Sequence, residues 1–314
     1  MDHALTLEHV VKSFGSFKAV DDISLAIPRG SVYGFLGPNG AGKTTTIRMI
    51  MNIIRPDVGE IRILGQPAGE RVKDRTGYLP EERGVYKKMK VLELVAYFGT
   101  LKGMSAREAR QRGEELLVGI GLGDWIARNC QDLSKGMQQK VQFVSTVIHG
   151  PELVILDEPF SGLDPVNTEL LKDQILALRD HGATVLFSTH IMDQAEQLCD
   201  YVVLIDQGRK VLDGTLDEVK QSAGGEVVVL ETRGAVPDLA SLPMVAAVSD
   251  FGHHREIQLS DGASPDELLA ALVGKTSIRR FEVRRPSLHE VFLRTVGRTA
   301  MSPDEETQDQ AVAR

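Results

Sequence analysis

The stretch Gly37-Pro-Asn-Gly-Ala-Gly-Lys-Thr44 decides the fold. It matches the pattern G-x-x-x-x-G-K-[ST], and the apolar run Ser31–Leu36 before it favours a strand while the residues after it favour a helix. Glycines let consecutive backbone N–H groups point inward at a phosphate, and a helix N-terminus adds a partial positive charge. We therefore predict a nucleotide-binding loop. Its expected contacts come from Gly37, Pro38, Asn39, Gly40, Ala41, Gly42, Lys43, Thr44 and Thr45.

The acid pair Asp157 and Glu158 supplies the next part of the predicted site. The pair follows the apolar run Leu153–Leu156, and a strand beside the loop would bring both acids to the bound phosphates. An acid pair at a strand end is often only a surface feature, but downstream of a phosphate-binding loop it has a chemical purpose. We predict that Thr44 and Asp157 bind Mg²⁺, that Lys43 bridges the β- and γ-phosphates of ATP, and that Glu158 is the general base for the attacking water.

His190 ends another strand-like run, Thr184–Thr189. A lone histidine is more often structural than functional, and we interpret His149 and His181 in that way. His190 differs because it stands at the carboxyl end of a strand, where α/β sheets bind their ligands. We predict that it contacts the γ-phosphate and takes part in catalysis with Lys43 and Glu158.

Composition excludes several other classes of protein. The 314 residues carry a net charge of −8, whereas a nucleic-acid-binding protein usually has a basic domain or stripe. Cys130 and Cys199 are far apart and form neither a disulfide framework nor a zinc pattern. The N-terminus lacks the pattern of a signal peptide, and we find no apolar run of about 18 residues that could span a membrane. We expect any pore to be formed by another polypeptide.

The order of the motifs predicts an α/β fold with two domains. Residues 1–222 alternate strand-like and helical stretches, with a helical insertion at about 82–132. A short Ser/Ala/Gly stretch, Ser222–Gly225, then marks a boundary. Strand and helix patterns with N-terminal capping signals continue through 223–300 and predict a small accessory α/β domain. Residues 301–314 are polar and are predicted to be a disordered tail.

With Leu133-Ser-Lys-Gly-Met-Gln138 added, residues 5–220 resemble the ATP-binding cassette (ABC) ATPases, a class of P-loop NTPases. This resemblance implies a head-to-tail homodimer in which Ser134 and Gly136 of one protomer close on the γ-phosphate held by the other. It also implies that Ser161–Asp164 forms a dimer contact. Phe14 matches the aromatic residue that stacks on adenine, and the alternative is an ordinary core phenylalanine.

The sequence departs from the family pattern at three positions. Lys135 and Met137 alter the signature segment but leave Ser134 in place. Glu81 stands where the family has a glutamine that senses Mg²⁺, and we predict that its carboxylate contacts the metal or a water bound to it. The run around Glu81, LPEERGVYKKMK, resembles a subfamily of exporter ATPases associated with sodium or drug efflux, and the segment Pro286–Phe292 resembles an accessory domain of that subfamily.

These features predict an ATP-hydrolysing subunit that drives export through a separate membrane permease, peripheral to the cytoplasmic face of the membrane and without a nucleic-acid partner. A basic cluster, Arg83, Lys87, Lys88 and Lys90, would be the docking surface, or else a solvated face. The alternatives are non-transport ABC ATPases. DNA-repair or chromosome ATPases would carry coiled-coil or zinc insertions, a ribosome-acting factor would carry two cassettes, and an iron–sulfur assembly subunit would have soluble partners.

Overall fold

The computed structural model describes residues 2–82, 84, 86–222, 226–234, 236–260 and 262–300, with only the helical backbone described at 294 and 296–300. The chain forms two compact units, residues 1–213 and a smaller unit that begins at Gly214. This division lies before the predicted boundary at 222/223, because helix α7 (Leu216–Ser222) packs against helix α9 (Leu288–Ala300) of the smaller unit. The predicted tail, 301–314, lies outside the described residues.

A six-stranded sheet with the order β10-β9-β3-β8-β7-β6 forms the centre of the larger unit. Strands β3, β6, β7, β8 and β9 pair in parallel, and three of them are completely buried, which explains their unbroken apolar runs. The strands are β3 (Val32–Leu36), β6 (Thr76–Leu79), β7 (Leu153–Asp157), β8 (Thr184–Thr189), β9 (Tyr201–Asp206) and β10 (Arg209–Thr215).

An antiparallel sheet with the order β2-β1-β4-β5 lies on the other side of helix α1 (Lys43–Ile50). Apolar side chains of α1 join the cores of both sheets into one cluster, so the loop before α1 is held from two sides. The strands are β1 (His3–Phe14), β2 (Phe17–Pro28), β4 (Val58–Ile63) and β5 (Gln66–Pro67).

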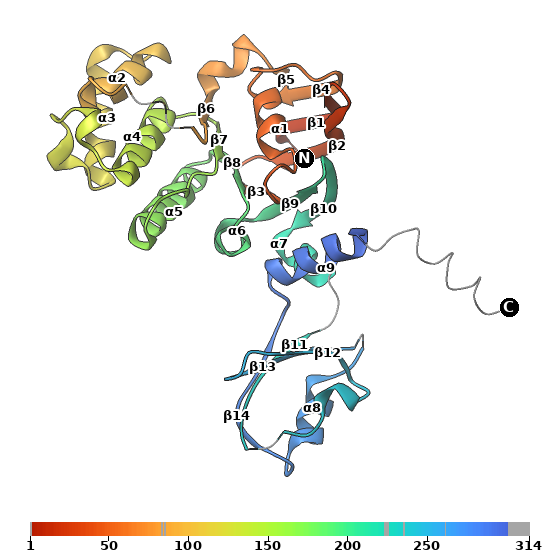
Figure 1. The fold of residues 1–314 in the computed structure, drawn as a ribbon. Coiled ribbons are helices and arrows are strands. Elements are labelled where there is room, and N and C mark those ends of the chain that lie inside the picture. The colour runs from red at the N-terminus through yellow and green to blue at the C-terminus, as the bar shows by residue number, and fades with distance from the viewer. Residues whose placement is uncertain are drawn as a thin grey trace. The chain divides into compact units, whose positions relative to one another are not determined.

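The predicted helical insertion contains two helices, α2 (Val91–Leu101) and α3 (Ala106–Gly119), which pack with α4 (Lys135–Val147). Figure 1 shows these three helices grouped together, apart from the sheet of β1, β2 and β4. Two further helices, α5 (Pro165–Asp180) and α6 (Met192–Leu198), pack against the central sheet, and 3₁₀ turns lie at Glu70–Arg75, Gly123–Trp125 and Cys130–Asp132. No helix among the described residues is long and apolar enough to cross a membrane.

The smaller unit has a four-stranded sheet with the order β12-β13-β11-β14 and its own core around helix α8 (Pro265–Leu272). Its strands are β11 (Val227–Arg233), β12 (Val245–Asp250), β13 (Arg255–Leu259) and β14 (Ser277–Arg284), and a 3₁₀ turn lies at Leu239–Ser241. Ser287 caps α9 in a capping box with Glu290, as the sequence predicts.

Candidate active site

The glycine-rich loop connects β3 to α1 and packs closely against neighbouring backbone. Gly42 has a φ of 103°, and a Cβ atom there would lie 2.4 Å from the carbonyl oxygen of Ala19. A Cβ atom on Gly37 would lie 2.2 Å from the carbonyl oxygen of Ile205. Only glycine fits either place. The predicted pattern of glycines therefore has a direct steric cause.

Lys43 is the first residue of α1, and its side chain is buried beneath the loop. Its Nζ atom donates hydrogen bonds to the carbonyl oxygens of Gly37 (2.7 Å) and Pro38 (3.1 Å) and lies 3.9 Å from Oε1 of Glu158. Burial lowers the pKa of Lys43, while the negative charges of Glu158, Asp157 and Glu81 act to raise it. The lysine is thus a buried cation surrounded by acids.

Asp157, at the end of β7, is fully buried. Its Oδ1 atom accepts a hydrogen bond from Ser188 Oγ at 2.5 Å and lies 3.5 Å from Thr44 Oγ1. Its Oδ2 atom is buried and has no hydrogen-bond partner among the described residues. A buried carboxylate oxygen without a partner is costly, and Mg²⁺ prefers oxygen ligands of this kind. Asp157 and Thr44 therefore fit a Mg²⁺ site.

Glu158 follows Asp157 in a left-handed backbone conformation, with a φ of 49°. Its backbone N–H donates to the Ser188 carbonyl oxygen at 3.2 Å and to Ser188 Oγ at 3.1 Å. This unfavourable conformation turns the carboxylate away from the strand direction and toward His190, whose Nδ1 lies 2.9 Å from Glu158 Oε1. The ends of β7 and β8 thus bring together the two residues that the sequence analysis placed near the γ-phosphate.

Lys43, Thr44, Glu158 and His190 line a cavity of about 460 Å³, whereas Asp157 is buried behind its lining. Its lining contains most of the predicted loop residues together with the predicted Glu81, Glu158 and His190. The residues are Phe17, Ala19, Asn39, Gly40, Gly42, Lys43, Thr44, Thr45, Glu81, Glu158, Ser161 and His190. Ser134 caps α4 by accepting from the Met137 N–H at 3.2 Å, and neither Ser134 nor Gly136 lines this cavity.

Sequence reasoning missed three residues of the site: Phe17, Ala19 and Ser188. Phe17 lines the cavity, whereas Phe14 does not; Phe14 pairs with Phe17 across the β1–β2 turn, is 52% exposed, and its ring lies 5.6 Å from Lys12 Nζ. Ser188 holds both Asp157 and the Glu158 backbone. The only sequence signal for Ser188 was that a hydroxyl residue stands near the end of an apolar strand. Ser188 belongs to the site because the pairing of β7 with β8 places it opposite Asp157.

Comparison with known proteins identifies the family of the chain. A family model described as ABC transporter matches residues 20–161, and one described as the C-terminal domain of DrrA1-3-like ATP-binding proteins matches residues 214–296. The chain is 43% identical over 293 residues to the uncharacterized ABC transporter ATP-binding protein YhaQ of Bacillus subtilis, covering 93% of this chain and 98% of that protein. It is 34% identical over 304 residues to the Nod factor export ATP-binding protein I of Cupriavidus pinatubonensis, covering 94% and 91%.

Among solved structures, the ATP-binding subunit of an ABC transporter superimposes with a TM-score of 0.65 at 32% identity, covering 70% of this chain and 92% of that one. The range that the ABC transporter family model matches, 20–161, contains the loop and the acid pair. The chain therefore belongs to the ABC transporter family, as an ATP-binding subunit with the ATPase activity and the Mg²⁺-bound ATP of that family.

Proposed function

We propose that this chain is the motor of an exporter: a homodimer that closes around two ATP molecules and drives a separate permease from the cytoplasmic face of the membrane. The export direction is supported by the C-terminal domain, which matches the DrrA1-3-like model, and by the relative that is named for Nod factor export. The full-length match to that relative includes the accessory unit as well as the ATPase unit.

The observation that carries the catalytic part is that Lys43, Thr44 and Glu158 line one cavity, with the buried Asp157 3.5 Å from Thr44 Oγ1. We assign the phosphates to Lys43 and the loop amides, and the metal to Thr44 and Asp157, with Glu81 beside them. Bound Mg²⁺ would neutralise charge on the phosphates. The left-handed backbone at Glu158 aims its carboxylate at the attacking water, and His190 holds that carboxylate in place.

Dimerisation completes the site in this proposal. Ser134 and Gly136 begin helix α4 and do not reach the cavity of their own chain. The N-terminus of α4 offers backbone N–H groups that suit a phosphate oxygen, so we place it on the γ-phosphate bound by a second copy. Ser161 lines the cavity and starts the Ser161–Asp164 segment that would pack between the two copies. The base would stack on Phe14, Phe17 or both.

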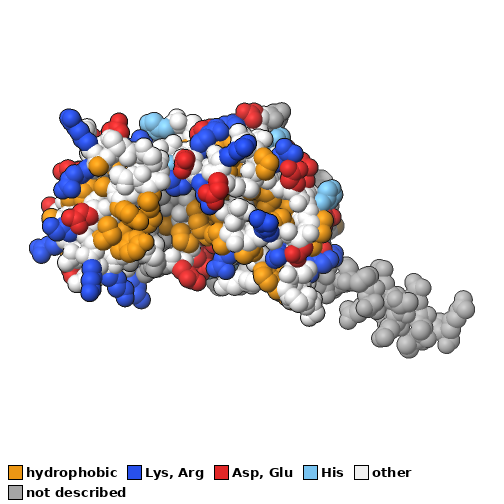
Figure 2. All heavy atoms as spheres, turned by 90° about the horizontal axis from the view of Figure 1, so that it is seen from above, with side chains coloured by type: hydrophobic (Ala, Val, Ile, Leu, Met, Phe, Trp, Pro, Cys, Tyr) orange, Lys and Arg blue, Asp and Glu red, His pale blue; other side chains and the backbone are white. Residues whose placement is uncertain are grey.

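The permease would dock in a groove between the helical part and the central sheet. A cavity of about 340 Å³ there has apolar walls, with Tyr78 and Leu79 on one side and Leu94, Phe98 and Leu101 on the other. Figure 2 shows hydrophobic side chains gathered on one face of the molecule, over the helical part and beside the adjoining hollow. Large exposed apolar patches of this kind mark interaction sites.

The basic cluster predicted from the sequence extends this surface. Lys87, Lys88 and Lys90 are exposed on the segment that joins the groove to α2. Arg83 lies outside the described residues. An acidic segment of the permease would complement these lysines.

The substitution Glu158→Gln tests the proposed role of Glu158 as the general base in ATP hydrolysis. It keeps the size of the side chain but removes the base, so we expect MgATP binding to persist, phosphate release to fall about 10²–10⁴-fold, and an ATP-bound dimer to accumulate in analytical ultracentrifugation. Glu152→Gln is the matched control, because Glu152 lies at the other end of β7 and pairs with Arg75. Phosphate release at the unsubstituted rate in Glu158→Gln would exclude Glu158 as the base.

A further inference from the structure

The floor of the groove is polar although its walls are apolar. Gln142 on α4 and His149 in the turn after α4 line this floor. The Oε1 atom of Gln142 and both ring nitrogens of His149 are buried without a hydrogen bond of normal geometry to any described residue. The neighbouring polar groups are satisfied. Thr146 Oγ1 donates to the Gln142 carbonyl oxygen at 2.9 Å, and Lys102 Nζ donates to the Thr76 carbonyl oxygen at 3.2 Å.

The His149 ring is neutral at physiological pH. Burial, and after it the positive charge of Lys102, lower the pKa of His149 to about 4, although the nearby Thr76 backbone acts to raise it. A neutral imidazole has one N–H donor and one acceptor nitrogen. Together with the side-chain Oε1 atom of Gln142, the floor therefore presents one donor and two acceptors. The charged Lys102 also lines the groove, but its Nζ atom already donates to the carbonyl oxygens of Lys73 and Thr76.

We propose that this floor recognises a neutral hydrogen-bonding side chain, an amide or a hydroxyl, on the segment of the permease that docks in the groove, so that Gln142 and His149 select the partner. The inference rests on the proposed function and adds the chemistry of recognition. A buried polar site discriminates strongly, because a partner without the matching group leaves the floor atoms unpaired.

Exposed side chains close in sequence to the lining residues Gly84 and Phe98 favour a protein segment over a small molecule as the occupant. Tyr86, Tyr97 and Leu101 are 54%, 41% and 58% exposed, and the two tyrosine rings meet edge to face with centroids 6.1 Å apart. A small ligand on the floor would leave this aromatic rim in water. Aromatic side chains around a desolvated centre are typical of protein interfaces, and the lysines 87 and 88 beside Tyr86 favour acidic residues at the edge of the docked segment.

The unpaired floor atoms predict opposite effects on the free chain and on docking. Buried polar atoms without partners destabilise the free chain, so an apolar replacement of similar shape removes that cost. The same replacement removes the groups that the permease would satisfy. Gln142→Leu and His149→Leu should therefore leave the melting temperature unchanged or raise it by about 2–4 °C, while they weaken docking.

The test compares binding to two kinds of vesicle. Inverted membrane vesicles of the organism that encodes the chain, stripped of peripheral proteins, are the probe, and liposomes of the lipids extracted from them are the control. We expect unsubstituted protein to bind the vesicles saturably and the liposomes weakly. Each variant should bind the vesicles at least about tenfold more weakly with its basal ATPase activity unchanged, since neither residue lines the nucleotide cavity.

A matched control lies on the same helix. The Nε2 atom of Gln139 is buried and already donates to the Pro159 carbonyl oxygen at 3.1 Å, so Gln139→Leu should lower the melting temperature. If a leucine variant does not fold, Gln142→Met, which keeps the unbranched shape, replaces it.

Three results would overturn the inference. Variants that melt at a lower temperature yet bind vesicles as tightly as unsubstituted protein would show that the floor atoms serve only the free chain, for example through a buried water. Unsubstituted protein that binds vesicles no better than liposomes would overturn the docking part of the proposed function together with this inference, whereas equal binding by all variants would overturn the inference only.

Discussion

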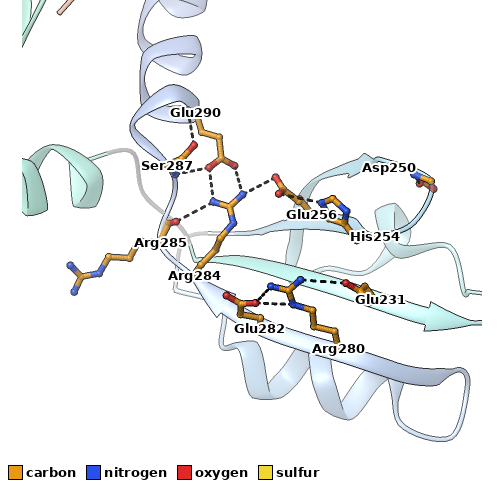
Figure 3. A network of polar contacts seen from close by, with 11 residues as sticks. Glu231, Asp250, His254, Glu256, Arg280, Glu282, Arg284, Arg285, Ser287 and Glu290 are labelled. Carbon is orange, nitrogen blue, oxygen red and sulfur yellow. Dashed lines mark hydrogen bonds and ion pairs between the residues drawn. The ribbon is translucent and has the colours of Figure 1, made fainter. Parts of the chain in front are cut away.

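The substitution Arg284→Met should destabilise the accessory unit far more than Arg280→Met on the same strand. Figure 3 shows Arg284 of β14 reaching Glu256 of β13 and Glu290 of α9, so one guanidinium ties the sheet to the final helix. The Arg284 nitrogens lie 2.8 Å from a Glu256 oxygen and 2.7 Å from a Glu290 oxygen. Arg280 likewise contacts two acids, Glu231 and Glu282.

Burial separates the two arginines. The side chains of Arg284, Glu256 and Glu290 are 26%, 22% and 23% exposed, whereas that of Arg280 is 51% exposed. Removing one partner of a fully buried ion pair costs about 3–5 kcal/mol, because the remaining charge is stranded. With a quarter of each side chain in water, we expect Arg284→Met to cost about 2–3 kcal/mol. Exposed pairs contribute about 0–1 kcal/mol, which sets the value for Arg280→Met.

Hydrogen exchange of the full-length protein in increasing urea measures both values within the accessory unit. Backbone amides of β11 and α9 report its opening directly, so the ATPase unit does not enter the result. Methionine keeps most of the length of arginine and limits the loss of packing. Equal loss of protection in the two variants would refute the reasoning, since it would show that burial does not set the strength of these pairs.

Four further predictions test other parts of the structure. Gly42→Ala should abolish nucleotide binding, measured by fluorescent ATP titration, because its Cβ has no room and its backbone is left-handed. Glu81→Gln should hydrolyse ATP at close to the unsubstituted rate, and loss of Mg²⁺-dependent phosphate release would show that the carboxylate is required. Phe17→Ala should weaken ATP binding more than Phe14→Ala in the same titration, by about tenfold for one lost stacking contact; the reverse order would assign the base to Phe14. Burial acts to raise the pKa of Glu290, but hydrogen bonds from Arg284 and Ser287 outweigh burial and hold that pKa below its usual range. The ionised Glu290 therefore stabilises the accessory unit above about pH 4.5, and this stabilisation is lost as the pH falls through the lowered pKa. Glu290→Gln should remove this acid-dependent loss of hydrogen-exchange protection.

The parts of the fold that depend on neighbouring residues were predictable from the sequence. About ten consecutive residues are enough to recognise each of three features: the loop at 37–44 by its glycine spacing, the buried strands by their apolar runs, and the Ser287 cap by its capping pair. The position of Asp157 and Glu158 followed from the same local pattern, because the carboxyl ends of parallel strands share one edge of the sheet.

Features that depend on register between distant segments were not predictable in this way. Phe14 and Phe17 both flank one turn, and bulges in the β1–β2 pairing decide which ring faces the cavity. Ser188 matters only because β7 and β8 pair in the register that places it opposite Asp157. The start of the accessory unit at Gly214 depends on the contact of α7 with α9, which lie far apart in the sequence.

The electrostatics of the site explain why a glutamate at position 81 is compatible with ATP binding. The acids Asp157, Glu158 and Glu81 act on one buried lysine, Lys43, and ATP adds further negative charge. Like charges that share a site repel each other, so we expect nucleotide binding, as well as chemistry, to depend on a divalent ion at the unpartnered Oδ2 atom of Asp157. We expect a carboxylate at position 81 to increase that dependence, because it would offer the metal a further oxygen and would repel metal-free ATP. Nucleotide affinity in this chain should therefore fall more steeply on Mg²⁺ removal than in its Glu81→Gln form.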